Sequence, residues 1–430
     1  MLFKFKILYF YLKLKISKWI FKKNYAGLQQ IRWKQYAKRL TASPFYKQLL
    51  VEGTKFQDFP ILNKELFMHN FNSINTCGID VKDALQVAIE AENSRDFNPH
   101  INGITVGLST GTSGNRGCFL VSENERALWV ACVLDRVIGF TFRKRKVAFF
   151  MRANSNLYQS VQSNLLFFHF FDILKNIEEN MSNLNSLQPD IIVGQPSLLR
   201  LIAKEIEAKR IKISPNKVIS IAEVLSPEDK IYLEKIFAQT IHQVYQCTEG
   251  FLAHTCKFGT LHFNEDFLII EKKFVDEEKS KFHPIITDLF RISQPVIRYE
   301  LNDIICVKNG CHCGSSMMAI EQIEGRSDDI FYLKNEDDKA VAIFPDFIRK
   351  AIILADEEIA DYAVLQISSQ EIELYIQSEN INAYDKAEQA LHQMLAILKI
   401  KNITIQKIIN DPYMVGTKKR RIRNEANKQN

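Results

Sequence analysis

Short apolar runs of strand length alternate with segments of helical periodicity through the middle of the chain. Runs of about four to eight apolar residues bounded by polar ones are typical of strands buried on both faces of a sheet. They predict strands at residues 146–151, 190–193, 218–222 and 241–245. Between the last two, Ser226-Pro227 marks a helix start, with a hydroxyl N-cap before a proline. Strands that alternate with helices indicate an α/β body with mostly parallel sheets.

The pattern changes near residue 325, where the polar sequence Gly325-Arg326-Ser327-Asp328-Asp329 interrupts it. The residues that follow have strand patterns of their own and a helical pattern at 383–398. About 100 residues of this kind are enough for a small α+β domain. The predicted parts are an N-terminal arm at 1–26, a large α/β domain at 27–324, a hinge at 325–329 and a small α+β domain at 330–430.

The composition is that of a globular protein with more than one core, because 430 residues with 46% hydrophobic content exceed a single compact core. The net charge of +6 is unevenly distributed. Residues 1–51 hold twelve Lys and Arg and no acid, which leaves 44 basic and 50 acidic residues for the rest of the chain. Because the body is acidic overall, we expect no nucleic-acid partner.

The arm at residues 1–23 mixes aromatic and aliphatic side chains with lysines. Its longest uncharged run, Ile7–Leu12, is far shorter than the ~20 residues that span a bilayer, and it has no signal-peptide cleavage pattern. Two interpretations stay open: a helix packed on its own domain, and a basic amphipathic helix in peripheral contact with an anionic membrane surface. We expect a cytoplasmic protein, on the inner membrane face in the second case.

A loop rich in glycine and hydroxyl side chains follows the apolar run 104–106. Downstream, Ser122 and Glu125 form a capping box ahead of a helical pattern at 127–138. A strand, a Gly/Ser/Thr loop and then a helix is an arrangement suited to phosphate, although no Walker spacing occurs. The candidate phosphate-binding residues are Ser109, Thr110, Gly111, Thr112, Ser113 and Gly114.

The eight cysteines favour buried thiols or a metal site over disulfides, because no secretory signal accompanies them. Cys256, His262, Cys311 and Cys313 together would make a closed Cys₃His site, which is typical of structural Zn²⁺. Separate buried thiols with a surface histidine are the alternative, and His312 is a second candidate for the fourth ligand.

Four separated motifs resemble those of the adenylate-forming enzymes, the acyl-CoA ligases and their relatives. The loop at 109–117 resembles their phosphate loop, and 245–250 (Tyr-Gln-Cys-Thr-Glu-Gly) resembles their aromatic-Gly-x-Thr-Glu motif. Residues 298–303 resemble the Arg-Tyr-x-x-x-Asp segment, and 325–329 the Gly-Arg-x-Asp-Asp hinge. The resemblance is closest to the phenylacetate–CoA ligase branch, which includes capsule-biosynthesis homologues and enzymes that adenylate a deazaflavin coenzyme.

The resemblance implies a role for each matching residue. The loop would hold ATP phosphates, Tyr245 would stack on adenine, Thr248 would contact the α-phosphate and Glu249 would bind Mg²⁺. Asp303 would accept the ribose hydroxyls with help from Arg326. Asp328 would be the hinge about which a mobile C-terminal lid domain rotates between half-reactions.

The resemblance also implies a catalytic lysine near the C-terminus. Lys418 has the better spacing to the arginines that follow it. The glycine expected directly before the lysine is Thr417 here, so Lys419 is the alternative candidate for the catalytic lysine. A solvated basic tail is the alternative interpretation of this run. Two further residues depart from the family pattern. Gln246 stands where the aromatic-Gly-x-Thr-Glu motif has a glycine, and Gly117 stands where many phosphate loops of the family have a lysine.

The expected activity is therefore ATP- and Mg²⁺-dependent conversion of a small carboxylic acid to an acyl-adenylate. Acyl transfer to a thiol, coenzyme A, would follow. One alternative is adenylyl or acyl transfer to a coenzyme or a glycan precursor in cell-surface polysaccharide synthesis. Another is a membrane-associated homologue that has lost catalysis.

Overall fold

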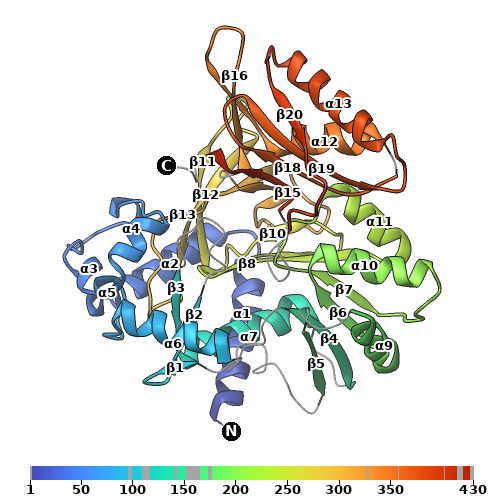
Figure 1. Cartoon of the computed structure of the whole chain (residues 1–430). Helices are drawn as coiled ribbons and strands as arrows, with labels where there is room; N and C mark the ends of the chain where they lie inside the picture. The colour runs from blue at the N-terminus through green and yellow to red at the C-terminus, as the bar shows by residue number, and fades with distance from the viewer. Residues whose placement is uncertain are drawn as a thin grey trace. The chain divides into compact units, whose positions relative to one another are not determined.

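The computed structural model describes residues 2–94, 99–108, 117–139, 143–151, 165–172, 177–326, 329–356, 358–400, 402–413 and 420–426. The chain separates into two compact units (Figure 1). The larger unit holds Met1–Leu301 and Ile305–Ile323, and the smaller unit holds Asn302–Ile304 and Glu324–Asn430.

Five parallel strands form one part of the main sheet of the larger unit; the four predicted strands are confirmed, and β5 is an addition to them. In spatial order they are β5 (Leu166–Asp172), β4 (Arg145–Met151), β6 (Ile191–Gly194), β7 (Lys217–Ser220) and β8 (Ile241–Cys247). Along β4, Val147 and Phe149 join one hydrophobic core, while Ala148 and Phe150 join another. A continuous apolar run is therefore needed, because both faces of these strands are covered.

Helices cover both faces of the parallel strands. The helices α9 (Ile177–Leu187), α10 (Pro196–Glu207) and α11 (Pro227–Phe237) contribute to the core that contains Phe150. The N-cap of α11 is confirmed, since the Ser226 side chain accepts a hydrogen bond from the backbone N–H of Asp229. On the other face, α7 (Glu123–Cys132) continues into a π-helix, η3 (Val133–Ile138).

The same sheet continues beyond β8 with strands in mostly antiparallel pairs. In spatial order they are β9 (Gly250–Thr255), β10 (Leu261–Phe263), β15 (Ala319–Arg326), β14 (Asp303–Lys308), β12 (Lys281–Asp288) and β11 (Leu268–Phe274), and β13 (Tyr299–Glu300) pairs with β12. The α/β class is confirmed, with a mixed sheet, because the short links between β8, β9 and β10 can join only antiparallel neighbours.

The N-terminal segment of the larger unit is helical. It contains α1 (Leu2–Phe21), α2 (Tyr25–Ala37), α3 (Pro44–Lys47), α4 (Lys64–His69), α5 (Phe71–Ile74) and α6 (Val81–Ser94), with short 3₁₀ turns at Leu40–Ala42 and Phe56–Asp58. None of the helices in the described ranges is long and apolar enough to cross a bilayer.

The glycine- and hydroxyl-rich loop connects two strands, not a strand and a helix. A small sheet pairs β1 (His100–Ile101), β2 (Ile104–Leu108) and β3 (Cys118–Val121), and α7 starts only after β3. The predicted strand–loop–helix order is therefore wrong, because residues 118–121 pair with β2 before the capping box begins. Gly107 allows this pairing, since a Cβ there would lie 2.2 Å from the Phe119 ring.

The smaller unit is an α+β domain. It contains β16 (Phe331–Lys334), β17 (Ala340–Ile343), α12 (Pro345–Ala355), β18 (Ile359–Gln366), β19 (Glu371–Ser378), α13 (Ala383–Ile397), β20 (Thr404–Lys407) and β21 (Ile422–Asn424). Its main sheet has the order β20-β19-β18-β21. A core of its own, with Phe331, Ile352, Leu374 and Leu391 at its centre, accounts for its compactness.

Candidate active site and metal cluster

The Thr-Glu motif forms the turn at the carboxyl end of β8. Cys247 pairs with Gly250, so Thr248 and Glu249 make a two-residue link to β9. The Thr248 hydroxyl donates to Glu249 Oε2 over 2.8 Å, and Tyr245 is buried three residues earlier. In open α/β sheets, ligands bind at the carboxyl ends of strands where the strand arrangement changes. The turn lies at such a point, because β8 is parallel to β7 and antiparallel to β9.

Buried Arg291 fixes the position of this turn. Its Nη1 donates to the Thr248 carbonyl oxygen over 2.6 Å, and its Nη2 donates to the Leu120 carbonyl oxygen over 3.1 Å. Leu120 belongs to β3, the strand that follows the phosphate-loop sequence. One guanidinium therefore joins the Thr-Glu turn to the strand that carries the loop. Sequence patterns did not identify Arg291, since the contact spans 43 residues on one side and 171 on the other.

The capping-box glutamate has a second role. The carboxylate of Glu125 caps α7 by accepting from Ser122, which confirms the capping box. It also accepts from the backbone N–H of Ser293 over 2.9 Å and from that of Ile292. These bonds hold the segment next to Arg291 against the start of α7.

Asp288 lies under the turn, at the end of β12. Its Oδ1 accepts from the backbone N–H groups of Phe290 and Arg291, at 2.8 and 3.2 Å. Burial raises the pKa of this carboxyl to about 6, against the opposing effect of these hydrogen bonds. A Cβ on Gly250 would lie 3.4 Å from Asp288 Oδ2, so the motif glycine leaves room for the carboxylate.

The predicted ribose-binding pair lies within the smaller unit. Arg326 Nε is 3.6 Å from Asp303 Oδ1, and both side chains are partly exposed. Next to them, Asp329 accepts from the backbone N–H of Arg326 and forms an ion pair with Arg420. Burial raises the pKa of Asp329, while Arg420 opposes that rise.

Several predicted site residues lie outside the described residues. They are Ser109, Thr110, Gly111, Thr112, Ser113, Gly114, Asp328 and Lys418, together with the alternative Lys419. The residues after the two lysines, 420–426, are described, and their contacts argue against the alternative of a solvated basic tail. Arg420 pairs with Asp329, Arg421 Nε lies 2.9 Å from Asp361 Oδ1, and residues 422–424 form β21.

The predicted metal ligands lie together in the larger unit. The ligand atoms of Cys256, His262, Cys311 and Cys313 all fall within 4.8 Å of one another. The Sγ atoms of Cys256 and Cys311 are 3.7 Å apart, and Cys313 Sγ is 3.4 Å from His262 Nε2. His262 is only 2% exposed, so the alternative of a surface histidine does not apply.

The surroundings of this cluster suit a metal ion. His262 Nδ1 lies 3.0 Å from the Met317 carbonyl oxygen, which fixes the ring and leaves Nε2 facing the thiols. The backbone N–H groups of Cys313 and Ser315 point to the Sγ atoms of Cys311 and Cys313, each at 3.5 Å, and N–H donors of this kind stabilise thiolates. Three sulfurs and one imidazole in a closed group match the donor set of structural zinc.

No protein-family model matches the chain. Among curated proteins, the chain is 25% identical over 161 residues to "Protein CapK" of Staphylococcus aureus. The match takes in 36% of this chain and 35% of that protein, so the chain spans about a third of the curated relative it matches.

Solved structures resemble the chain over most of its length. A 2-hydroxyisobutyryl-CoA ligase in the postadenylation state has a TM-score of 0.64 at 16% identity, over 93% of this chain and 88% of that one. The amide bond synthetase McbA from Marinactinospora thermotolerans has a TM-score of 0.55 at 10% identity, over 74% and 68%. The anthranilate CoA ligase AuaEII has a TM-score of 0.53 at 12% identity, over 73% and 65%. The chain therefore has the fold of the adenylate-forming ligases.

Proposed function

We propose that the protein activates a carboxylic acid with ATP and transfers the acyl group to a thiol, coenzyme A. A carboxylate oxygen of the acid attacks the α-phosphorus of ATP and the bond to pyrophosphate breaks, which leaves an acyl-adenylate. The thiol sulfur then attacks the acyl carbon, the thiol proton is lost and AMP leaves. The observation that carries this proposal is the Thr248-Glu249 turn, held by Arg291 at the end of β8 in a ligase fold.

The residues of the turn suit the first step. Attack of one anion on another requires charge neutralisation and in-line positioning more than proton transfer. Thr248 supplies a hydroxyl for the α-phosphate, and Glu249 supplies a carboxylate that would hold Mg²⁺ beside it. Bound Mg²⁺ would neutralise phosphate charge. Tyr245 would stack on adenine, and the loop 109–114 would hold the phosphates.

The remaining roles fall to the smaller unit. The carboxylate of Asp303, with Arg326 3.6 Å away, would accept the ribose hydroxyls. Lys418 would stabilise the charge that develops at the α-phosphate. Asp328 would serve as the hinge for rotation of this unit between the two half-reactions.

We further propose that Cys256, His262, Cys311 and Cys313 hold a structural Zn²⁺. The ion would tie the β9–β10 turn to the segment before β15, close in sequence to the Thr-Glu turn. None of the eight cysteines, all of which lie in the described ranges, forms a disulfide, which fits a reducing compartment such as the cytoplasm, where ATP and coenzyme A are found.

The test is carboxylate-dependent exchange of labelled pyrophosphate into ATP, over a panel of aryl, fatty, hydroxy and amino acids. Exchange that depends on one class of acid would establish adenylation and identify the substrate class. Coenzyme A would then be added to detect the thioester. ATP binding without exchange for any acid would contradict this proposal and favour adenylyl transfer to a coenzyme or a glycan precursor. Absence of ATP binding would favour a homologue without catalysis.

A further inference from the structure

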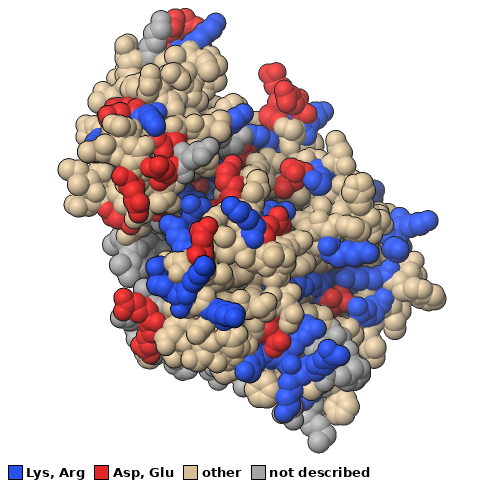
Figure 2. Space-filling view, turned by 90° about the vertical axis from the view of Figure 1, so that its right-hand side faces the viewer, with Lys and Arg blue, Asp and Glu red and all other residues tan. Residues whose placement is uncertain are grey.

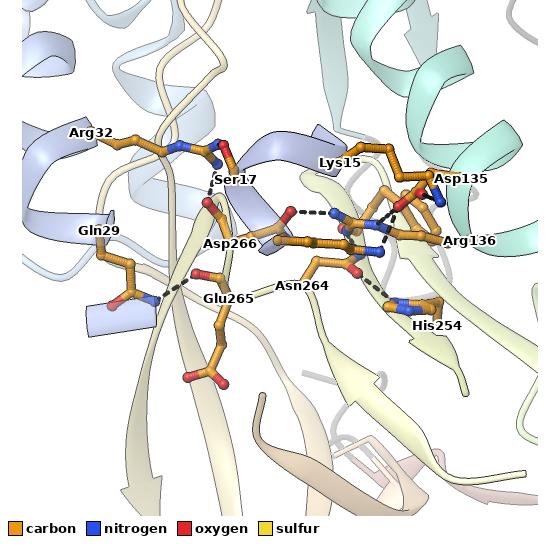
Figure 3. A network of polar contacts seen from close by, with 12 residues as sticks. Lys15, Ser17, Gln29, Arg32, Asp135, Arg136, His254, Asn264, Glu265 and Asp266 are labelled. Atoms are coloured by element: carbon orange, nitrogen blue, oxygen red, sulfur yellow. Dashed lines mark hydrogen bonds and ion pairs between the residues drawn. The ribbon is translucent and has the colours of Figure 1, made fainter. Parts of the chain in front are cut away.

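The N-terminal helix α1 is fixed to the larger unit by ion pairs from its lysines. Lys15 Nζ lies 2.8 Å from Asp135 Oδ1 (Figure 3), and Lys18 Nζ lies 2.5 Å from Asp135 Oδ2. The Asp135 side chain is fully buried. Burial alone would raise its pKa, but the two lysines lower it to about 2, so the carboxyl is ionised and paired at neutral pH.

A chain of polar contacts extends this attachment into the core. Arg136, the neighbour of Asp135, donates to the carboxylate of Asp266 over 2.5 Å. Arg32 of α2 donates to the backbone carbonyl of Asp266 and, over 3.0 Å, to the hydroxyl of Ser17 on α1 (Figure 3). Near the start of α1, Lys6 Nζ lies 2.8 Å from Glu123 Oε1. The helix is thus attached along its whole length.

The outward face of α1 is apolar. Its members are Leu2, Phe5, Leu8, Tyr9, Leu12, Ile16, Trp19 and Ile20. At 3.6 residues per turn these positions fall within about 120° of the helix circumference, so they form one continuous stripe. Trp19 is 83% exposed and Leu2 is 70% exposed. A helix that served only to cover its own domain would direct such a stripe inward.

Lysines border the stripe on both sides. By the same helical geometry, Lys4 and Lys15 lie along one edge and Lys6 and Lys13 along the other, and Lys22 follows the helix directly. No acidic residue occurs before Glu52, and the ion pairs described above take up Lys6, Lys15 and Lys18 but not Lys4 or Lys13. Figure 2 shows Lys and Arg side chains gathered over the lower part of the face it presents.

We propose that this outward face of α1 lies on an anionic lipid bilayer, parallel to its surface. The aromatic and aliphatic stripe would enter the boundary between headgroups and acyl chains, and Lys4, Lys13 and Lys22 would contact anionic headgroups. Because α1 is fixed to the body, binding would hold the enzyme against the surface without a crossing segment. This inference does not depend on the proposed activity, and it places that activity beside substrates or acceptors embedded in a membrane.

The experiment is flotation of the full-length protein with vesicles of phosphatidylcholine alone and of phosphatidylcholine mixed with phosphatidylglycerol. A Leu12→Glu/Trp19→Glu variant places two charges on the exposed stripe. Ile231→Glu is the matched control, because Ile231 on α11 is 69% exposed and lies outside α1. Circular dichroism and thermal melting verify that each variant is folded.

The expected result is flotation with the anionic vesicles, weakened by salt, lost in Leu12→Glu/Trp19→Glu and retained in Ile231→Glu. A Lys4→Gln/Lys22→Gln variant should bind anionic vesicles more weakly by about fivefold per lysine. Absence of flotation, or equal flotation of the stripe variant, would overturn the proposal. A dimer by light scattering that the stripe variant converts to a monomer, without vesicle binding, would overturn it and assign the face to a second copy of the chain.

Discussion

Arg291 donates to the carbonyl oxygen of Thr248 over 2.6 Å, and its other terminal nitrogen reaches the carbonyl of Leu120 on β3. The two carbonyls belong to the Thr-Glu turn and to the strand that carries the phosphate-loop sequence. Because a guanidinium presents its donors in a planar fork, it can fix two backbone segments at once. Arg291 is therefore a positioning residue for the proposed site.

Replacement of Arg291 by lysine should lower kcat/KM for pyrophosphate exchange. An ammonium group cannot span both carbonyls, so the turn loses its register with β3, and a displacement of about 1 Å can cost roughly 10²-fold in rate. The loss of kcat/KM should be accompanied by only the small change in melting temperature that is expected from one lost hydrogen bond. Arg200→Lys, on α10 at the ion pair with Asp229 of α11, is the control and should retain exchange. Equal exchange in both variants would contradict the positioning role of Arg291.

The substitution Glu249→Gln should reduce pyrophosphate exchange by about 10²–10³-fold, the range for loss of one preorganised electrostatic contact. A glutamine can still accept the hydrogen bond from Thr248, so the turn should keep its shape while losing the charge that binds Mg²⁺. The measurement is exchange as a function of Mg²⁺ concentration, with Glu205→Gln, at the ion pair with Arg210 outside the proposed site, as the control. An unchanged Mg²⁺ requirement would contradict the metal-binding role.

Four of the five parallel strands, β4, β6, β7 and β8, were predictable from continuous apolar runs such as the one that contains Phe149 and Phe150. The strand β5 was not predicted, and exposed positions interrupt its burial. The antiparallel strands of the main sheet, from β9 to β15, were not predicted, since strands joined by tight turns give weak periodicity, whereas β18 and β19 of the smaller unit follow strand patterns in the sequence. The Cys and His ligand set could be grouped from residue type alone. Arg291 and the second role of Glu125 could not, because they depend on backbone groups that only the folded chain brings near.

The substitution Cys313→Ser should lower the zinc content of the purified protein from about one ion per chain towards zero, since a structural site needs all four ligands. Melting with and without a chelator gives a second measurement, because a bound structural metal stabilises the folded state. Cys306→Ser lies outside the cluster and should keep both the metal and the chelator response. Purified wild-type protein that is folded and free of metal would contradict the zinc proposal.

The substitution Lys418→Ala should slow formation of the acyl-adenylate by roughly 10²–10³-fold, because it removes one charge that stabilises the transition state. Lys419→Ala is the matched control and should remain active. Single-turnover formation of the adenylate separates this step from thioester formation. If Lys419→Ala loses adenylation and Lys418→Ala does not, Lys419 and not Lys418 is the catalytic lysine.

The pH dependence of stability should contain a contribution from Asp288. Burial raises the pKa of this carboxyl from 3.8 to about 6, so the folded state favours the protonated form. Between these values the native protein holds a proton that the unfolded chain releases, so stability falls as pH rises. Above the folded pKa the full penalty is present, roughly 3 kcal/mol for a difference of this size.

Replacement of Asp288 by asparagine removes that ionisation while keeping an oxygen that can accept from the backbone N–H groups of Phe290 and Arg291. The variant should therefore unfold at higher denaturant than the wild type at pH 8, with the difference shrinking towards pH 4. Asp276→Asn should show the opposite trend, because hydrogen bonds from Ser280 and Lys281 outweigh burial and lower the pKa of Asp276. A difference in stability between Asp288→Asn and the wild type that does not change with pH would contradict the raised pKa of Asp288.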